Sequence, residues 1–144
     1  MGRCYAPRRL EAVRTRSVDR SKYRNYLLKS EEFLVTAKEA LERGRYNTCV
    51  LNAVHAIISA ADALLVFVKG YRYAGTRHEE AVELFSTIFP GEPEHEKNVT
   101  RFGTILSIKN KAEYMEVLLS SKDAADALRD ATRFLDYVKG NLPR

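Results

Sequence analysis

Apolar residues recur at helical spacing through most of this 144-residue chain, and no stretch keeps the apolar–polar alternation of a strand. Residues typical of helix ends divide the pattern into five segments. The predicted helices extend from Ser21 to Gly44, from Tyr46 to Gly70, from Thr76 to Pro90, from Glu94 to Tyr114 and from Ser120 to Gly140. Asp123 follows Ser120 by three residues, an arrangement that satisfies free N–H groups at a helix start. The short connections predict an all-α fold, a four- or five-helix antiparallel (up-and-down) bundle.

The second predicted helix is apolar on nearly all sides, which is typical of a helix at the centre of a bundle. Its longest apolar stretch, residues 53–68, contains His55 and Asp62, so we expect it to be too short and too polar to cross a membrane. The first residues include no apolar run of the kind found in secretory signals. We therefore expect a cytoplasmic protein without a membrane segment.

Basic residues are concentrated at the start of the chain. Residues 1–24 contain eight Lys and Arg and two acidic residues, a balance of +6 within a net charge of +5. The basic residues are Arg3, Arg8, Arg9, Arg14, Arg16, Arg20, Lys22 and Arg24. We expect residues 1–21 to form a flexible basic arm and residues 22–144 to form the bundle. Such an arm suits phosphate backbones or acidic partners, or serves only as a solvated tail.

The positions of cysteine and histidine favour neither a disulfide nor a metal site. Cys4 lies in a polar segment and Cys49 in an apolar helix, which favours a reducing, intracellular setting. His95 lies beside Glu94 and Glu96 without a second ligand at helical spacing. The sequence also has no phosphate-binding glycine loop and no nucleophile elbow. We expect no metal and no cofactor.

Six pieces of sequence, taken in order, carry a resemblance to a known family. They are the Ala- and Glu-rich stretch 31–40, the small-residue-rich stretch 52–65, Gly70, the sequence Thr76-Arg77-His78, the sequence Lys109-Asn110-Lys111-Ala112-Glu113-Tyr114, and the segment 120–124. Their order and spacing over residues 22–140 resemble the HEPN superfamily of small helical bundles. The resemblance implies a bundle that often forms a homodimer, with a basic motif facing a cleft near the dimer axis.

The resemblance also implies which residues carry the function. In nuclease members of the family an Arg and a His, four to six residues apart, cleave RNA. Here Lys109 takes the place of the Arg, Asn110 the polar position beside it, and Tyr114 the place of the His. Histidine exchanges protons near neutral pH, whereas the pKa of tyrosine is about 10, and lysine lacks the two-pronged geometry of arginine. These departures favour binding, with Lys109 and Lys111 on phosphate and Tyr114 stacked on a base, over cleavage.

Four further residues are candidates for the site, and each also has a purely structural interpretation. His55 and Asp62 lie seven residues apart, on the same side of the second helix. A buried Asp62 needs a partner, either Lys109 in the cleft or an arginine at the surface of the bundle. His55 is either a base or a satisfied core histidine. Arg77 and His78 open the third helix, as binding residues or only as polar residues of its first turn.

Three hypotheses follow. The leading one is a non-catalytic RNA- or nucleotide-binding module that forms a homodimer and is the partner of a nucleotidyltransferase in a toxin–antitoxin-like pair. The second is a metal-independent endoribonuclease that uses Lys109 and Tyr114 with His55 or His78. The third is a bundle for protein–protein interactions, in which the segment 109–111 is only a solvated helix end.

Overall fold

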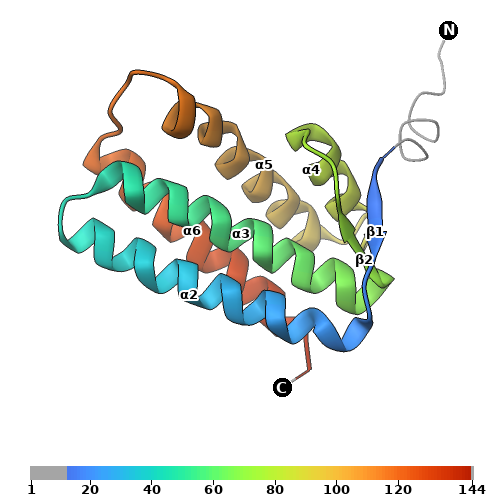
Figure 1. Ribbon diagram of the computed structural model, residues 1–144. Helices are drawn as coiled ribbons and strands as arrows, with labels where there is room; N and C mark the ends of the chain where they lie inside the picture. Colours follow the sequence, from blue (N-terminus) through green and yellow to red (C-terminus); the bar gives the residue numbers. More distant parts are fainter. Residues whose placement is uncertain (1–12, 144) are drawn as a thin grey trace, which may run out of the picture.

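The longest helix, α3 (Tyr46–Lys69), lies at the centre of a bundle (Figure 1). The computed structural model describes residues 13–143. The other elements are the strands β1 (Thr15–Ser17) and β2 (Tyr71–Tyr73), the 3-10 helix η1 (Arg20–Lys22), and the helices α2 (Tyr23–Glu42), α4 (His78–Ser86), α5 (Pro93–Tyr114) and α6 (Ser121–Gly140). The predicted all-α bundle is confirmed, with α2, α5 and α6 packed around α3.

The apolar surface of α3 explains its central place. Val50, Val54 and Leu64 are completely buried, and burial of one such side chain contributes roughly 1.5–3 kcal/mol. By length and composition the whole of α3, which is longer than the apolar stretch 53–68, is long and apolar enough to cross a membrane. However, 61% of its most apolar window is buried inside the protein. This is the burial of a core helix whose neighbours are other helices of the same chain.

A two-stranded antiparallel sheet at one end of the bundle was not predicted. Thr15 pairs with Tyr73, and Ser17 pairs with Tyr71. Each strand has three residues, too few to show a period of two in the sequence. The expectation of a flexible arm therefore differs from the structure over residues 13–21, which form β1 and part of η1 against the bundle. Residues 1–12, which include Arg8 and Arg9, lie outside the described residues.

The ends of the helices follow local side-chain chemistry. Ser120 accepts a hydrogen bond from the Asp123 N–H, and the Asp123 carboxylate accepts one from the Ser120 N–H, so the predicted cap of α6 is confirmed. In contrast, α4 begins at His78 and ends at Ser86, four residues before the predicted stop at Pro90. The helical spacing of apolar residues continues past Ser86, so the sequence predicted a longer helix than the structure shows.

His95 lies in the first turn of α5, inside the helix predicted from Glu94 to Tyr114. Its ring is completely buried, with Nε2 2.8 Å from the Phe85 carbonyl oxygen and Nδ1 2.6 Å from the Tyr137 hydroxyl. In the neutral imidazole Nε2 donates to the carbonyl, so Nδ1 accepts from Tyr137. One histidine thereby joins α4, α5 and α6.

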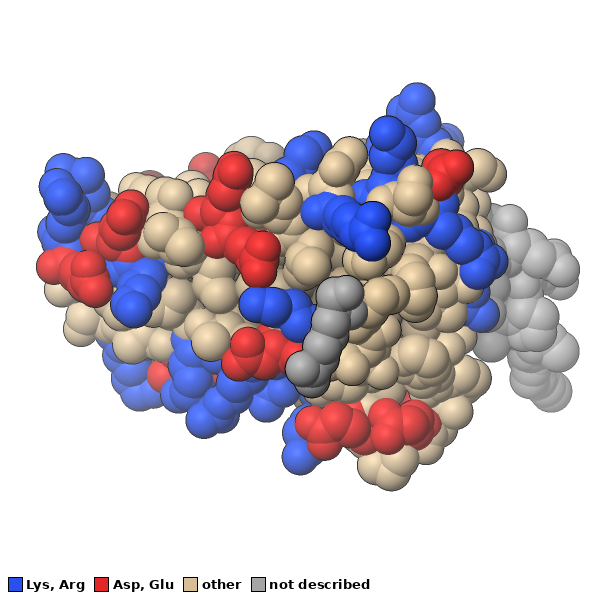
Figure 2. All heavy atoms as spheres, turned by 90° about the horizontal axis from the view of Figure 1, so that it is seen from below, with Lys and Arg blue, Asp and Glu red and all other residues tan. Residues whose placement is uncertain are grey.

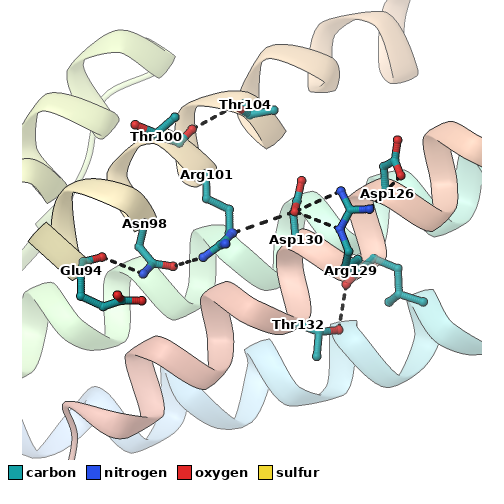
Figure 3. Close-up of polar contacts among 10 residues, drawn as sticks. Glu94, Asn98, Thr100, Arg101, Thr104, Asp126, Arg129, Asp130 and Thr132 are labelled. Carbon is teal, nitrogen blue, oxygen red and sulfur yellow. Dashed lines mark hydrogen bonds and ion pairs between the residues drawn. The ribbon is translucent and has the colours of Figure 1, made fainter.

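A row of polar contacts also joins α5 to α6 (Figure 3). The buried Asn98 donates to the Glu94 carbonyl (2.9 Å) and accepts from the Arg101 guanidinium (2.8 Å). Arg101 lies 3.9 Å from Asp130 of α6, which Arg129 also contacts at 3.4 Å. The side chains of Arg101 and Asp130 are about one-fifth exposed, so solvent screens this pair less than a surface pair. These contacts set the position of α5 and hence of the residues near its end.

Candidate functional site

A pocket of about 250 Å³ lies between α3, α5 and the segment that connects β2 to α4. Its apolar walls come from α3, α4 and α5, and its polar groups come from the same helices and the connecting segment. The apolar lining residues are Ile58, Ala61, Leu65, Ala81, Phe102 and Leu106, and the others are Asp62, Arg72, Tyr73, Gly75, Thr76, Arg77, His78 and Lys109. Apolar walls with a few convergent polar groups are typical of small-molecule sites.

Asp62 is the acidic group of the pocket. Burial raises the pKa of its carboxyl from 3.8 to about 7, although the nearby Arg72 charge and the Tyr73 N–H act in the opposite direction. Near neutral pH this carboxyl is therefore divided between its protonated and ionised forms. It can donate a hydrogen bond in one form and accept hydrogen bonds in both.

Four basic side chains line the same pocket, and one of them, Arg72, comes from β2. Arg77 and His78 come from the start of α4, and Lys109 comes from α5. Lys109 Nζ lies 2.8 Å from Glu113 Oε1, and this contact lowers the pKa of the Glu113 carboxyl. A phosphate in the pocket would compete with Glu113 for the ammonium group. Because Glu79 occupies the first turn of α4, the end of this helix is not by itself an anion site.

Tyr73 holds the connecting segment in place over the pocket. Its hydroxyl accepts a hydrogen bond from the Arg77 N–H (2.8 Å) and donates one to Glu80 (2.9 Å). Burial and the Glu80 carboxylate raise the pKa of this hydroxyl, so it stays protonated. A Cβ atom at position 75 would collide with the Tyr73 ring, which explains the glycine there. The turn from Tyr73 to Arg77 is therefore tightly folded, and it keeps Arg77 beside the pocket.

The structure brings four of the predicted site residues together and leaves others apart. Asp62, Arg77, His78 and Lys109 line the pocket, and Asp62 lies near the Arg72 charge whereas Lys109 pairs with Glu113. Residues that do not line it are His55, Asn110, Lys111 and Tyr114. His55 is exposed, with its ring 5.4 Å from that of Phe33, so it is not a core histidine.

Tyr114 is the last residue of α5, and its side chain is 74% exposed rather than packed. Lys109 lies over its ring at 6.0 Å. Glu113 interacts with residues inside and outside the pocket. It pairs with Lys109 of the pocket, and the nearby His55, outside the pocket, also lowers the pKa of its carboxyl. Of the motif residues 109–114, Lys109 is therefore the one that lines the pocket.

Four of the lining residues outside the apolar walls were not predicted as site residues: Thr76, which was expected only to open a helix, and three residues before it. Arg72, Tyr73 and Gly75 belong to the connection that follows Gly70, which we expected to be only a loop. The signal in the sequence was the alternation of aromatic and basic residues in Tyr71-Arg72-Tyr73. Among residues 13–143 no group of three or more His, Cys, Asp and Glu side chains is arranged to hold a metal ion.

Comparison with known proteins agrees with this architecture. A crystal structure of TT1696 from Thermus thermophilus superimposes on the chain with a TM-score of 0.65 at 16% sequence identity, covering 84% of this chain and 98% of that one. At this identity the likeness concerns the fold alone. No curated protein matches the sequence significantly. The sequence profile of the HEPN domain matches residues 23–141, which is nearly the whole described bundle. The chain therefore belongs to the HEPN domain family.

Proposed function

We propose that this protein is a cytoplasmic, non-catalytic module that binds a nucleotide or single-stranded RNA in the pocket between α3, α4 and α5. One observation carries the proposal. Asp62, Arg77, His78 and Lys109 come from three helices, and all of them line one pocket with apolar walls. If each of the four residues had only a structural role, they would not need to line the same pocket.

The chemistry of the pocket suits a nucleotide. Apolar walls from residues such as Leu65 and Phe102 accept the faces of a base, and the Asp62 carboxyl can donate to or accept from a base edge. Arg77 and Lys109 neutralise phosphate charge, and arginine does so with two parallel hydrogen bonds. The volume of about 250 Å³ is below the roughly 300–1,000 Å³ typical of small-molecule sites, so we expect only the base to enter, with its phosphate near the basic residues.

The arrangement favours binding over cleavage at the family motif. Tyr114 holds the place of the catalytic histidine, and it is exposed and outside the pocket. Lys109 is engaged by Glu113 at 2.8 Å. No proton-transfer pair is therefore formed between the two motif positions.

A metal-independent endoribonuclease is the second candidate, because His78 lines the same pocket as Lys109. Such an enzyme would use His78 to exchange protons near neutral pH. Product gels with labelled RNA across pH 5–9, run for the wild type and for His78→Ala, test this candidate. Cleavage that is lost in the variant would replace the binding proposal with the enzyme, and the absence of product from a clean preparation would remove the enzyme.

We extend the proposal to a homodimer that partners a nucleotidyltransferase in a toxin–antitoxin-like pair. Its support is family membership together with exposed apolar side chains after α5. Met115, Val117 and Leu118 are 50%, 42% and 83% exposed. Light scattering with gel filtration, on the chain alone and after co-expression with a candidate nucleotidyltransferase, tests both assemblies. A monomer that does not bind the nucleotidyltransferase would contradict this extension and leave the proposal about the binding pocket standing.

Binding assays test the pocket itself. We expect the Lys109→Ala variant to bind a labelled single-stranded RNA hexamer roughly fivefold more weakly at 0.1 M salt, because losing one phosphate contact lowers the salt dependence of log K by about 0.7. Lys122→Ala is the matched control. Lys122 makes a similar pair with Asp126 at 2.8 Å, but its side chain is 84% exposed and does not line the pocket. Binding that ignores salt, or that both variants weaken equally, would reject the proposal.

A further inference from the structure

A second cavity, of about 340 Å³, borders the pocket. It is lined by Arg14, Gly75, Thr76, Arg77 and Glu80, and the three residues 75–77 line the pocket as well. The two spaces are therefore neighbours that share the tight turn held by Tyr73. Two arginines, one from the N-terminal segment and one from the start of α4, lie beside this second cavity.

The pairing of β1 with β2 is what places Arg14 there. The Ala74 N–H donates to the Arg14 carbonyl at 3.0 Å, next to the Thr15–Tyr73 pair of the sheet. At the other end of β1, the Val18 N–H donates to the Gly70 carbonyl at 3.0 Å. Arg14 is thus attached by backbone hydrogen bonds to the connection that lines the pocket. A free arm would not keep a cation at one position.

The charges around the second cavity leave its arginines available to an anion. The Glu80 carboxylate keeps its charge at the wall of the cavity, but it accepts a hydrogen bond from the Tyr73 hydroxyl and, among the described residues, forms no ion pair with Arg14 or Arg77. Arg77 approaches Glu79 only at 3.8 Å, with both side chains at least 70% exposed, a geometry that contributes little. Within residues 13–143 Arg14 has no ion pair. Figure 2 shows several Lys and Arg side chains close together at the end of the molecule that carries β1.

We propose that this second cavity is a phosphate subsite, and that the ligand is single-stranded RNA rather than a mononucleotide. The inference rests on the proposed function of the pocket. A nucleotide whose base occupies the pocket has its own phosphate at Arg77, and the next phosphodiester of the strand then reaches Arg14. Arginine suits this role because its guanidinium binds phosphate oxygens with two hydrogen bonds.

The test compares a mononucleotide, a nucleoside triphosphate and RNA on the full chain. Calorimetry with AMP and ATP, and anisotropy with a fluorescein-labelled single-stranded RNA hexamer, are run on the wild type and on Arg14→Ala. We expect Arg14→Ala to leave AMP binding unchanged, to weaken hexamer binding roughly fivefold at 0.1 M salt, and to lower its salt dependence by about 0.7. Arg16→Ala is the matched control, since Arg16 has the same charge two residues along and lines neither space.

The other outcomes separate this subsite from the pocket. If Lys109→Ala weakens the hexamer and Arg14→Ala does not, the subsite is wrong and the pocket stands. Equal losses in Arg14→Ala and Arg16→Ala would mean a diffuse basic segment, which also overturns the subsite. A loss in Arg14→Ala for ATP but not for the hexamer would assign the cavity to a polyphosphate and reject the strand. If the wild type binds none of the three ligands, both proposals fail.

Discussion

Replacing Asp62 by asparagine should change how the stability of the protein depends on pH. The pKa of this carboxyl is raised in the folded protein to about 7, chiefly by burial, from 3.8 in a solvated chain. The folded state therefore binds the proton more tightly than the unfolded state does. The resulting stabilisation is fully present below pH 3.8 and is lost as the pH rises toward 7. Asparagine has no proton to lose and removes this dependence.

The two pKa values set the size of the effect. Between pH 5 and pH 8 the Asp62 carboxyl alone lowers the free energy of unfolding by roughly 2–3 kcal/mol, from proton linkage with pKa values of 3.8 and about 7. An effect of this size is a large part of the stability of a small domain, which is typically about 5–15 kcal/mol. Relative to the wild type, the Asp62→Asn variant should therefore gain about this amount between the two pH values.

Urea unfolding followed by circular dichroism at pH 5, 6.5 and 8 measures the difference. The control is Asp126→Asn, because the hydrogen bond from Lys122 lowers the pKa of that exposed carboxyl. Its contribution is lost only at acid pH, so the control should follow the wild type from pH 5 to pH 8. A free-energy difference between Asp62→Asn and the wild type that stays constant across this range would refute the reasoning about burial.

Two stability predictions concern the supporting contacts. Tyr137→Phe leaves Nδ1 of the fully buried His95 without its partner and should lower the free energy of unfolding by about 1–3 kcal/mol in urea, whereas a loss no larger than a few tenths would mean that water replaces the hydroxyl. Ser120→Ala removes the reciprocal cap formed with Asp123 and should cost about 1 kcal/mol by thermal unfolding, while Ser121→Ala, one residue further along, should cost much less. Equal losses in the two serine variants would contradict the role of the cap.

The helices and their ends were predictable because their causes are local. Apolar residues at a spacing of 3.6 select one face of a helix whatever the rest of the chain does. The Ser120 cap needs only a carboxyl three residues away, and Gly70 ends α3 with φ +80°, a conformation that glycine adopts without strain. The predicted start of the fourth helix at Glu94 is confirmed to within one residue, because α5 begins at Pro93.

The spacing of residues along the sequence does not show that a single pocket contains Asp62, Arg77, His78 and Lys109. Each residue type was recognisable along the chain, but their convergence depends on how α3, α4 and α5 pack, with buried contacts such as that of His95 setting the angle. Helix geometry also separates residues that are adjacent in the sequence. Lys109 lines the pocket, and its neighbours 110 and 111 face away from it because successive side chains on a helix point in different directions.

The N-terminal segment shows the same division between local and tertiary causes. Its charge is a property of composition and was evident from residues 1–24 alone. The pairing of this segment was not evident from the sequence. β1 pairs with residues 71–73, more than fifty positions further along the chain, and the backbone hydrogen bonds of this pairing do not depend on particular side chains. Sequence therefore established the helical family scaffold and the chemistry available to it. Tertiary packing selected which groups share a pocket and brought Arg14 to its border, since these distances depend on every helix at once.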